Sequence, residues 1–233
     1  AEDGAPAVLD RHPDVRRMLM TMKCRIEAMR ALSYSVAATH DIARRHPDAE
    51  TRARHQSRLD LLVPVVKAWS TDQGVDIASM GVQVHGGAGF IEETGAAQHY
   101  RDARITPIYE GANGIQALDL VGRKVMGDRG AAAGDLLDEM RAFVASRKDI
   151  EGVDELKAGI DALQRTTDWM IANGMPSAAA GATPYLEMFG IVVGGYLMVR
   201  SAAVAGERLA DANGEASFYR TKIATAEFYV RNV

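Results

Sequence analysis

The spacing of apolar residues is helical along almost the whole chain. From Pro13 onward, apolar side chains recur at steps of three and four residues, which predicts one helix of roughly thirty residues. We expect this helix to end at His46, because Pro47 disfavours helical geometry in the residue before it. The stripe consists of Val15, Met18, Leu19, Met22, Ile26, Met29, Leu32 and Val36.

A second helix is predicted from the apolar residues between Leu59 and Trp69. Pro64 should bend it, because proline lacks the N–H that a helix interior needs. The run from Ser70 to Gln73 can form a capping box, so we expect the helix to restart there. After the glycine-rich run at 83–90, two shorter helices are predicted at 92–101 and 115–125.

A domain boundary is predicted at 127–130, where two glycines bracket two charged residues. The sequence therefore predicts one domain over residues 1–126 and another over 131–233. Further helical patterns follow the boundary, at 136–144, 153–170, 185–209 and 217–233. Because no segment of useful length has strand periodicity, the predicted fold class is all-α, an up-down helical bundle followed by a second helical domain.

The most apolar predicted helix, 185–209, invites comparison with a membrane span, since Gly190 and Gly194 have the spacing that lets helices approach closely in lipid. Its charge-free part runs only from Met188 to Val199. That is well short of the roughly 20 residues that a bilayer requires. We therefore expect a buried core helix, with both glycines packed closely against a neighbouring helix of the second domain.

Composition and charge exclude several classes of partner. A net charge of -4 and a pI near 5.9 argue against nucleic-acid and anionic-membrane surfaces, which need concentrated Lys and Arg. The single Cys24 and the lack of a basic-then-apolar leader predict a cytoplasmic location. The chain starts at Ala1 without a methionine and its last segment is still helical, so we expect it to be part of a longer protein.

Common catalytic and metal motifs are missing from the sequence. No two of the six histidines stand four residues apart, so no metal site is predicted. The sequence contains neither a Gly-x-Ser-x-Gly elbow nor a P-loop. The absence of predicted strands also excludes nicotinamide binding by a Rossmann fold.

The glycine-rich run is the first candidate site. Gly86, Gly87 and Gly89 have no side chains to cover their N–H groups, so a phosphate or pyrophosphate could approach the backbone there. A helix C-cap followed by a turn accounts for the same glycines equally well. Residue chemistry alone leaves both interpretations open.

Glu110 is the second candidate. Ile108 and Tyr109 would partly desolvate its carboxylate, and Gly111 would leave its reach to a substrate unobstructed, which favours a general base. The alternative is a carboxylate that only stabilises the N-terminus of the following helix.

These residues resemble a known family. Gln-Val-His-Gly-Gly-Ala-Gly-Phe (83–90), Tyr-Arg-Asp-Ala-Arg-Ile-Thr-Pro-Ile-Tyr-Glu-Gly (100–111) and Ile-Gln (115–116) are similar to the C-terminal helical domain of FAD-dependent acyl-CoA dehydrogenases. The resemblance covers the first 125 residues in order and spacing. The remaining helices resemble the extra C-terminal domain of the longer members.

The resemblance implies a role for each candidate residue. Glu110 would remove the α-proton of an acyl-CoA thioester while the β-hydrogen leaves as hydride to the flavin. Gln83, Gly86 and Gly87 would contact the adenosine diphosphate half of FAD held by a neighbouring subunit. Ala112 and Gly114 would lie near the flavin, and Ala112 lacks the hydroxyl of the threonine usual in the family.

The resemblance also implies partners. They are an acyl-CoA substrate, electron-transfer flavoprotein as electron acceptor, and further copies of the same chain in a homodimer or tetramer. The family's N-terminal helical domain and β domain have no counterpart in this sequence, so the isolated chain should be inactive and should not retain FAD. Two alternatives stay open: a helical module that only mediates oligomerisation, and a relative that has lost the dehydrogenase chemistry.

Overall fold

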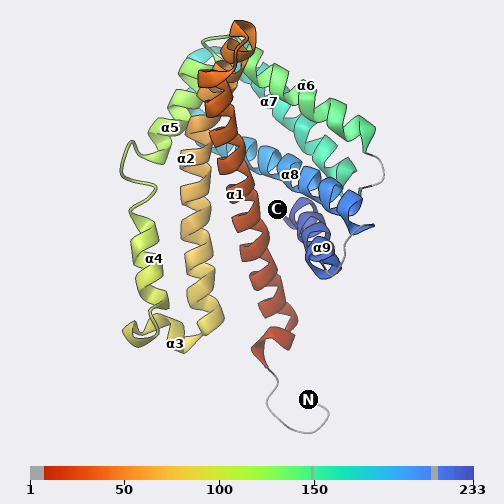
Figure 1. Cartoon of the computed structure of the whole chain (residues 1–233). Helices are drawn as coiled ribbons and strands as arrows, with labels where there is room; N and C mark the ends of the chain where they lie inside the picture. Colours follow the sequence, from red (N-terminus) through yellow and green to blue (C-terminus); the bar gives the residue numbers. More distant parts are fainter. Residues whose placement is uncertain (1–7, 148–149, 211–214) are drawn as a thin grey trace.

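The computed structural model describes residues 8–147, 150–210 and 215–233. Within these ranges the chain is built from helices and turns and contains no strand, which confirms the predicted all-α class. Two long helices form the centre of the molecule, with short helices along one side and four helices on the other (Figure 1).

Helices α1 (Pro13–Arg45) and α2 (Ala49–His85) form an antiparallel hairpin. The predicted first helix is confirmed, and its end lies at the expected proline. Asp48 caps α2 by accepting a hydrogen bond from the N–H of Thr51 at 2.7 Å. The buried face of α1 follows the predicted stripe in part, because Leu19 and Ile26 are exposed. Its buried residues are Met18, Cys24, Ala28, Leu32, Val36 and Thr39.

Helix α2 does not restart at Ser70, so that prediction was wrong. It continues through Pro64 as one helix of 37 residues. The hydroxyl of Thr71 hydrogen-bonds the carbonyl of Lys67 at 2.8 Å, inside the helix, instead of helping to cap a new one. The reason is tertiary, because Pro64, Val65, Ala68 and Trp69 are buried in the packed protein, which outweighs the hydrogen bond lost at the proline.

Short elements follow α2 along its outer side. They are α3 (Gly87–Phe90), η2 (Glu92–Thr94), α4 (Ala96–Arg104), α5 (Asn113–Asp119) and a π-helical continuation, η3 (Leu120–Val125). The helix predicted at 92–101 is interrupted at Gly95, which has a φ of 76°. Helix α4 runs back along α2, and a loop at 105–112 joins it to α5 (Figure 1).

The second part of the chain contains α6 (Ala131–Ser146), α7 (Val153–Ala180), α8 (Ala182–Leu209) and α9 (Ala216–Asn232). Helix α7 is kinked at Gly174, whose φ of 75° and ψ of 174° are not helical. Helix α8 is long and apolar enough to cross a membrane by length and composition, but 72% of its most apolar window is buried inside the protein. It is therefore the central core helix of this part.

The glycines of α8 explain how closely it packs. A Cβ atom at Gly194 would lie 2.6 Å from the Tyr229 hydroxyl oxygen on α9, as expected for packing within the second part. The same atom would lie 3.0 Å from Trp69 of α2, and the atoms nearest to a Cβ at Gly190 all belong to this tryptophan, so the expected neighbour in the second part was wrong for Gly190. The apolar core is continuous across residues 127–130, because residues of α1, α2, α5, η3 and α6–α9 share one buried cluster. The division into two domains stays a prediction.

Candidate functional site

Glu110 lies in the loop 105–112, and the backbone of this loop is strained. Glu110 has a φ of 55° and Gly111 a φ of 84°, so both lie in the left-handed region. Glycine adopts this region freely, whereas a residue with a side chain pays roughly 1–2 kcal/mol. Such conformations persist where the surrounding structure enforces them, and they are concentrated at functional sites.

The side chain of Glu110 is exposed. Helix α5 begins at Asn113 after Ala112, and no side chain caps it, so Glu110 does not cap this helix through a hydrogen bond. Stabilisation of the helix N-terminus by its charge stays a prediction. Contrary to the expectation from the sequence, Ile108 and Tyr109 also do not desolvate the Glu110 carboxylate. Ile108 and Tyr109 are themselves about half exposed and leave the carboxylate open to solvent. The described part of this chain therefore presents the carboxylate without enclosing it.

Asn113 ties the loop to α2 through both ends of its carboxamide. Its Nδ2 lies 3.0 Å from the carbonyl of Ala68, 2.9 Å from the Thr71 hydroxyl and 2.8 Å from the Asp72 carboxylate. Its Oδ1 accepts a hydrogen bond from Lys67 Nζ at 2.7 Å. The backbone N–H of Asn113 donates to the carbonyl of Pro107 at 3.0 Å and closes the loop on itself.

Lys67 makes a second contact with the same loop. Its Nζ donates to the carbonyl of Gly111 at 2.9 Å, directly beside Glu110. Sequence reasoning missed both Lys67 and Asn113. A signal for Lys67 was present, because a lysine interrupts the apolar run from Leu61 to Trp69. Its partner in the loop, however, lies more than forty residues away in the sequence.

The glycine-rich run forms a tight turn at the end of α2. Gly86 caps α2 with a φ of 61°. Its N–H donates to the carbonyl of Gln83, and the N–H of Gly89 donates to the carbonyl of Gly86. Two of the three amides that we expected to be uncovered are thus used inside the turn, because the chain reverses direction there. Gly86 and Gly87 are nevertheless exposed, with open space where a Cβ would project.

The two candidate segments do not meet within one chain. Lys67, which contacts the Glu110 loop, and Gln83, at the glycine turn, are separated by about 24 Å along α2 at 1.5 Å per residue. Figure 1 shows the same arrangement, with α3 at the far end of α2 and α5 at its middle. A ligand that contacts both segments would have to be extended, or each segment would have to serve a different copy of the chain.

Ala112 and Gly114 flank Asn113 at the start of α5. Both are exposed, and a Cβ at Gly114 would meet open space. Ala112 uses its carbonyl to accept hydrogen bonds from the N–H groups of Ile115 and Gln116. Its methyl group offers no hydrogen bond. Among the described residues, no group of three or more His, Cys, Asp or Glu side chains is arranged to hold a metal ion.

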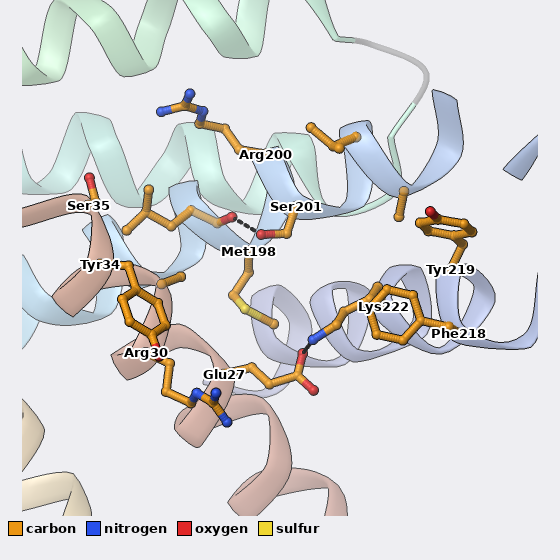
Figure 2. A pocket seen from close by; sticks show the side chains of 14 residues that line it. Glu27, Arg30, Tyr34, Ser35, Met198, Arg200, Ser201, Phe218, Tyr219 and Lys222 are labelled. Atoms are coloured by element: carbon orange, nitrogen blue, oxygen red, sulfur yellow. Dashed lines mark hydrogen bonds and ion pairs between the residues drawn. The ribbon is translucent and has the colours of Figure 1, made fainter. Parts of the chain in front are cut away.

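A groove lies away from both candidate segments, between α1, α8 and α9. It has a volume of about 780 Å³. Figure 2 shows that Lys222 reaches across it to Glu27, at 2.9 Å, so this cation and carboxylate neutralise each other. Apolar and aromatic side chains supply much of the remaining lining, among them Tyr34, Met198 and Phe218. No residue of the Glu110 loop or the glycine turn lines it.

Both parts of the chain match families of known proteins. Residues 5–126 match the family described as acyl-CoA dehydrogenase, C-terminal domain. Residues 136–233 match the family described as acetyl-CoA dehydrogenase C-terminal like.

Individual relatives match over nearly the full chain. It is 42% identical, over all of its residues, to 3-methylmercaptopropionyl-CoA dehydrogenase of Ruegeria pomeroyi, and covers 40% of that protein. It is 33% identical, over 98% of its residues, to the broad-specificity linear acyl-CoA dehydrogenase FadE5 of Mycobacterium tuberculosis. The match covers 40% of that protein as well. The chain thus spans about two fifths of the length of these relatives.

A solved structure that shares the fold is that of ACDH-11 of Caenorhabditis elegans in complex with C11-CoA. The TM-score is 0.73, and the match covers 95% of this chain and 36% of that one at 18% sequence identity.

Proposed function

The chain belongs to the acyl-CoA dehydrogenase family, and from this we propose that it is the C-terminal helical part of a longer FAD-dependent enzyme that oxidises an acyl-CoA thioester. The family matches and the identity to relatives named as acyl-CoA dehydrogenases support the reaction class. The observation that carries the proposal is the placement of Glu110, an accessible carboxylate on a strained loop that is tied to a core helix.

In the proposed reaction, Glu110 acts as the base. A carboxylate oxygen accepts the α-proton of the thioester, and the electron pair of the broken C–H bond forms the α,β double bond as the β-hydrogen departs with its own electron pair. The N–H of Glu110 would help to polarise the thioester carbonyl, on which negative charge develops. Bound FAD would supply the acceptor for the departing hydride.

The glycine turn at Gly86 and Gly87 fits FAD better than the segment around Ala112 does. The exposed backbone of Gly86 and Gly87 leaves room for a diphosphate to approach, which supports their proposed contact with FAD together with Gln83. Ala112 and Gly114 would lie beside the flavin, where Ala112 can give only apolar contact. Because Glu110 is exposed here, the substrate and other parts of the full-length enzyme would have to exclude water from it.

A homo-oligomer is part of the proposal. Of the eighteen exposed large apolar side chains among the described residues, eight fall within residues 90–118, so this outer segment is the best candidate for a partner surface. Assembly through it would also let the glycine turn of one copy serve the cofactor of another. The eight are Phe90, Ile91, Tyr100, Ile105, Ile108, Tyr109, Ile115 and Leu118. We further propose electron-transfer flavoprotein as the electron acceptor and a cytoplasmic location.

The test uses the full-length protein that contains this chain. We expect it to carry flavin and to lose its flavin absorbance when an acyl-CoA is added. Glu110→Gln should keep the flavin and lower turnover by at least 10³-fold, because the base is removed while the shape is kept. Glu93→Gln is the matched control, since Glu93 is also an exposed glutamate of the outer segment.

Two results would contradict the proposal. An active Glu110→Gln enzyme would exclude Glu110 as the base. A colourless full-length protein would instead favour the alternative of a non-catalytic oligomerisation module, for which the same exposed apolar residues are the supporting observation. The isolated chain, tested alongside, should bind no FAD and oxidise no acyl-CoA.

A further inference from the structure

The conformation of the Glu110 loop requires an anchor. Glu110 and Gly111 both have left-handed backbone geometry, which is unfavourable for Glu110 because its Cβ atom approaches the backbone closely. A free surface loop would relax into more favourable backbone regions. The side chain of Glu110 does not hold the loop in place, because it is exposed to solvent. The restraint must come from contacts of the backbone and of the rest of the loop. Gln116 Nε2 contributes a long contact, 3.4 Å from the carbonyl of Glu110, and the shorter contacts involve Asn113 and Lys67.

We propose that Asn113 is a positioning residue for Glu110, assisted by Lys67, an inference that rests on the proposed role of Glu110 as the base. Asn113 closes the loop through its backbone N–H, which donates to Pro107. Its side chain fixes the closed loop to α2 through Ala68, Thr71 and Asp72 on one side and Lys67 on the other.

The chemistry at this position requires a carboxamide. The Thr71 hydroxyl donates to the carbonyl of Lys67 in its own helix, so it is free to accept from Asn113 Nδ2. Asp72 can only accept, whereas Lys67 can only donate. One side chain must therefore donate hydrogen bonds to Thr71 and Asp72 and, at the same time, accept one from Lys67. Asparagine meets both requirements, whereas aspartate would place a second carboxylate against Asp72.

Lys67 completes the arrangement because it bonds Asn113 and Gly111 with the same ammonium group. The carbonyl of Gly111 belongs to the Gly111–Ala112 peptide, the second peptide group after Glu110, so this bond restrains the backbone just beyond Glu110. The groups that hold Asn113 and Gly111 all lie on residues 67–72 of α2, a long helix that packs against several neighbours. A catalytic group supported by a rigid element in this way is held more accurately than one on a free loop.

The first test measures the loop without reference to activity, by amide hydrogen exchange on this chain. Asn113→Ala should speed exchange about tenfold at Ile108 and Tyr109, whose N–H groups donate to Ile105, because loss of these anchoring bonds favours opening. Exchange in the core of α8 should not change, which reports that the variant is folded. Asn173→Ala is the matched control, since Asn173 bonds only within its own helix. Unchanged exchange in a folded Asn113→Ala variant overturns the proposal.

The second test uses the full-length enzyme. Asn113→Ala should lower kcat roughly 100-fold and change KM less than threefold, since misplacement of the base by about 1 Å affects the chemical step more than substrate binding. Flavin content should stay the same. Asn113→Asp should be similarly impaired, and adding Asp72→Asn should restore part of kcat by exchanging donor and acceptor. A loosened loop with an unchanged kcat would overturn the positioning role.

The outcomes of the two proposals can be distinguished. If Glu110→Gln remains active, the proposed role of Glu110 fails, whatever hydrogen exchange reports for Asn113. If Glu110→Gln is inactive but Asn113→Ala neither loosens the loop nor lowers kcat, the proposed function stands and the positioning role of Asn113 is wrong.

Discussion

Gly190 of α8 lies against the indole ring of Trp69 in α2. A Cβ atom at Gly190 would approach Cδ1 and Cδ2 of this ring to 2.6 Å, closer than real side chains allow. Trp69 is 1% exposed and belongs to the core shared by both parts of the chain. This glycine–tryptophan contact therefore connects the helix that supports the Glu110 loop to the central helix of the second part.

Gly190→Ala should lower the free energy of unfolding by about 1–3 kcal/mol, because the added methyl group forces a fully buried ring to move. Gly206→Ala in the same helix is the control. A Cβ there meets nothing within 4 Å, so the higher helix propensity of alanine should stabilise the chain by about 0.5–1 kcal/mol. Urea unfolding measures both changes. Equal effects of the two substitutions would contradict the packing argument.

The ion pairs of Glu27 should make stability depend on pH. Partial burial favours the neutral acid, but hydrogen bonds from Lys23 and Lys222 outweigh it and lower the pKa of Glu27. A lowered folded-state pKa means that the stabilisation is complete above the unfolded pKa of about 4.5 and is lost as pH falls through the folded value. Since Lys222 lies on α9, this loss should loosen the contact between α9 and α1.

The corresponding experiment compares urea unfolding of the wild type and Glu27→Gln from pH 7 to pH 3. The variant should be less stable at pH 7, and the difference should shrink at acid pH, where Glu27 of the wild type is protonated. Asp14→Asn removes an exposed carboxylate of the same helix and should change little at any pH. If the free energies of unfolding of the wild type and Glu27→Gln differed by the same amount at every pH, Glu27 would not be the source of the pH dependence.

Cys24 should be inert in the folded protein. It has no exposed surface, and burial raises the pKa of its thiol to about 11, so almost no thiolate forms at pH 8. We expect alkylation by iodoacetamide to be slower than in the urea-unfolded chain by about a hundredfold or more. Because the chain has one cysteine, total modification reports this site alone. Rapid native labelling would show that α1 opens at this position.

The exposed apolar residues of the outer segment should mediate self-association of the full-length protein. Phe90 is 82% and Ile91 47% exposed, so replacing both by serine should leave the unfolding free energy of this chain nearly unchanged. The same double substitution should shift the full-length oligomer toward monomer in sedimentation velocity. Val204→Ser is the control, because Val204 is also exposed but lies on α8. An unchanged oligomer would place the interface elsewhere.

Local sequence patterns were enough to predict the helical class, most helix positions and the family resemblance. Apolar steps of three and four residues are a local signal, and they located α1 from Pro13 to the proline after Arg45. The motif around Glu110 was equally local, since a run of consecutive residues carries it. The sequence also identified α8 as a core helix from the length of its charge-free part alone.

Which local signals prevail, and which distant residues meet, depends on how the helices pack against one another. The restart predicted for α2 at Ser70 does not occur, because residues around Pro64 are buried in a core shared with distant parts of the chain. The contacts of Asn113 with Lys67, and of Gly190 with Trp69, join residues far apart in sequence. No periodicity encodes such pairs, since they depend on how whole helices pack. For the same reason, the structure alone placed the two candidate segments about 24 Å apart along α2.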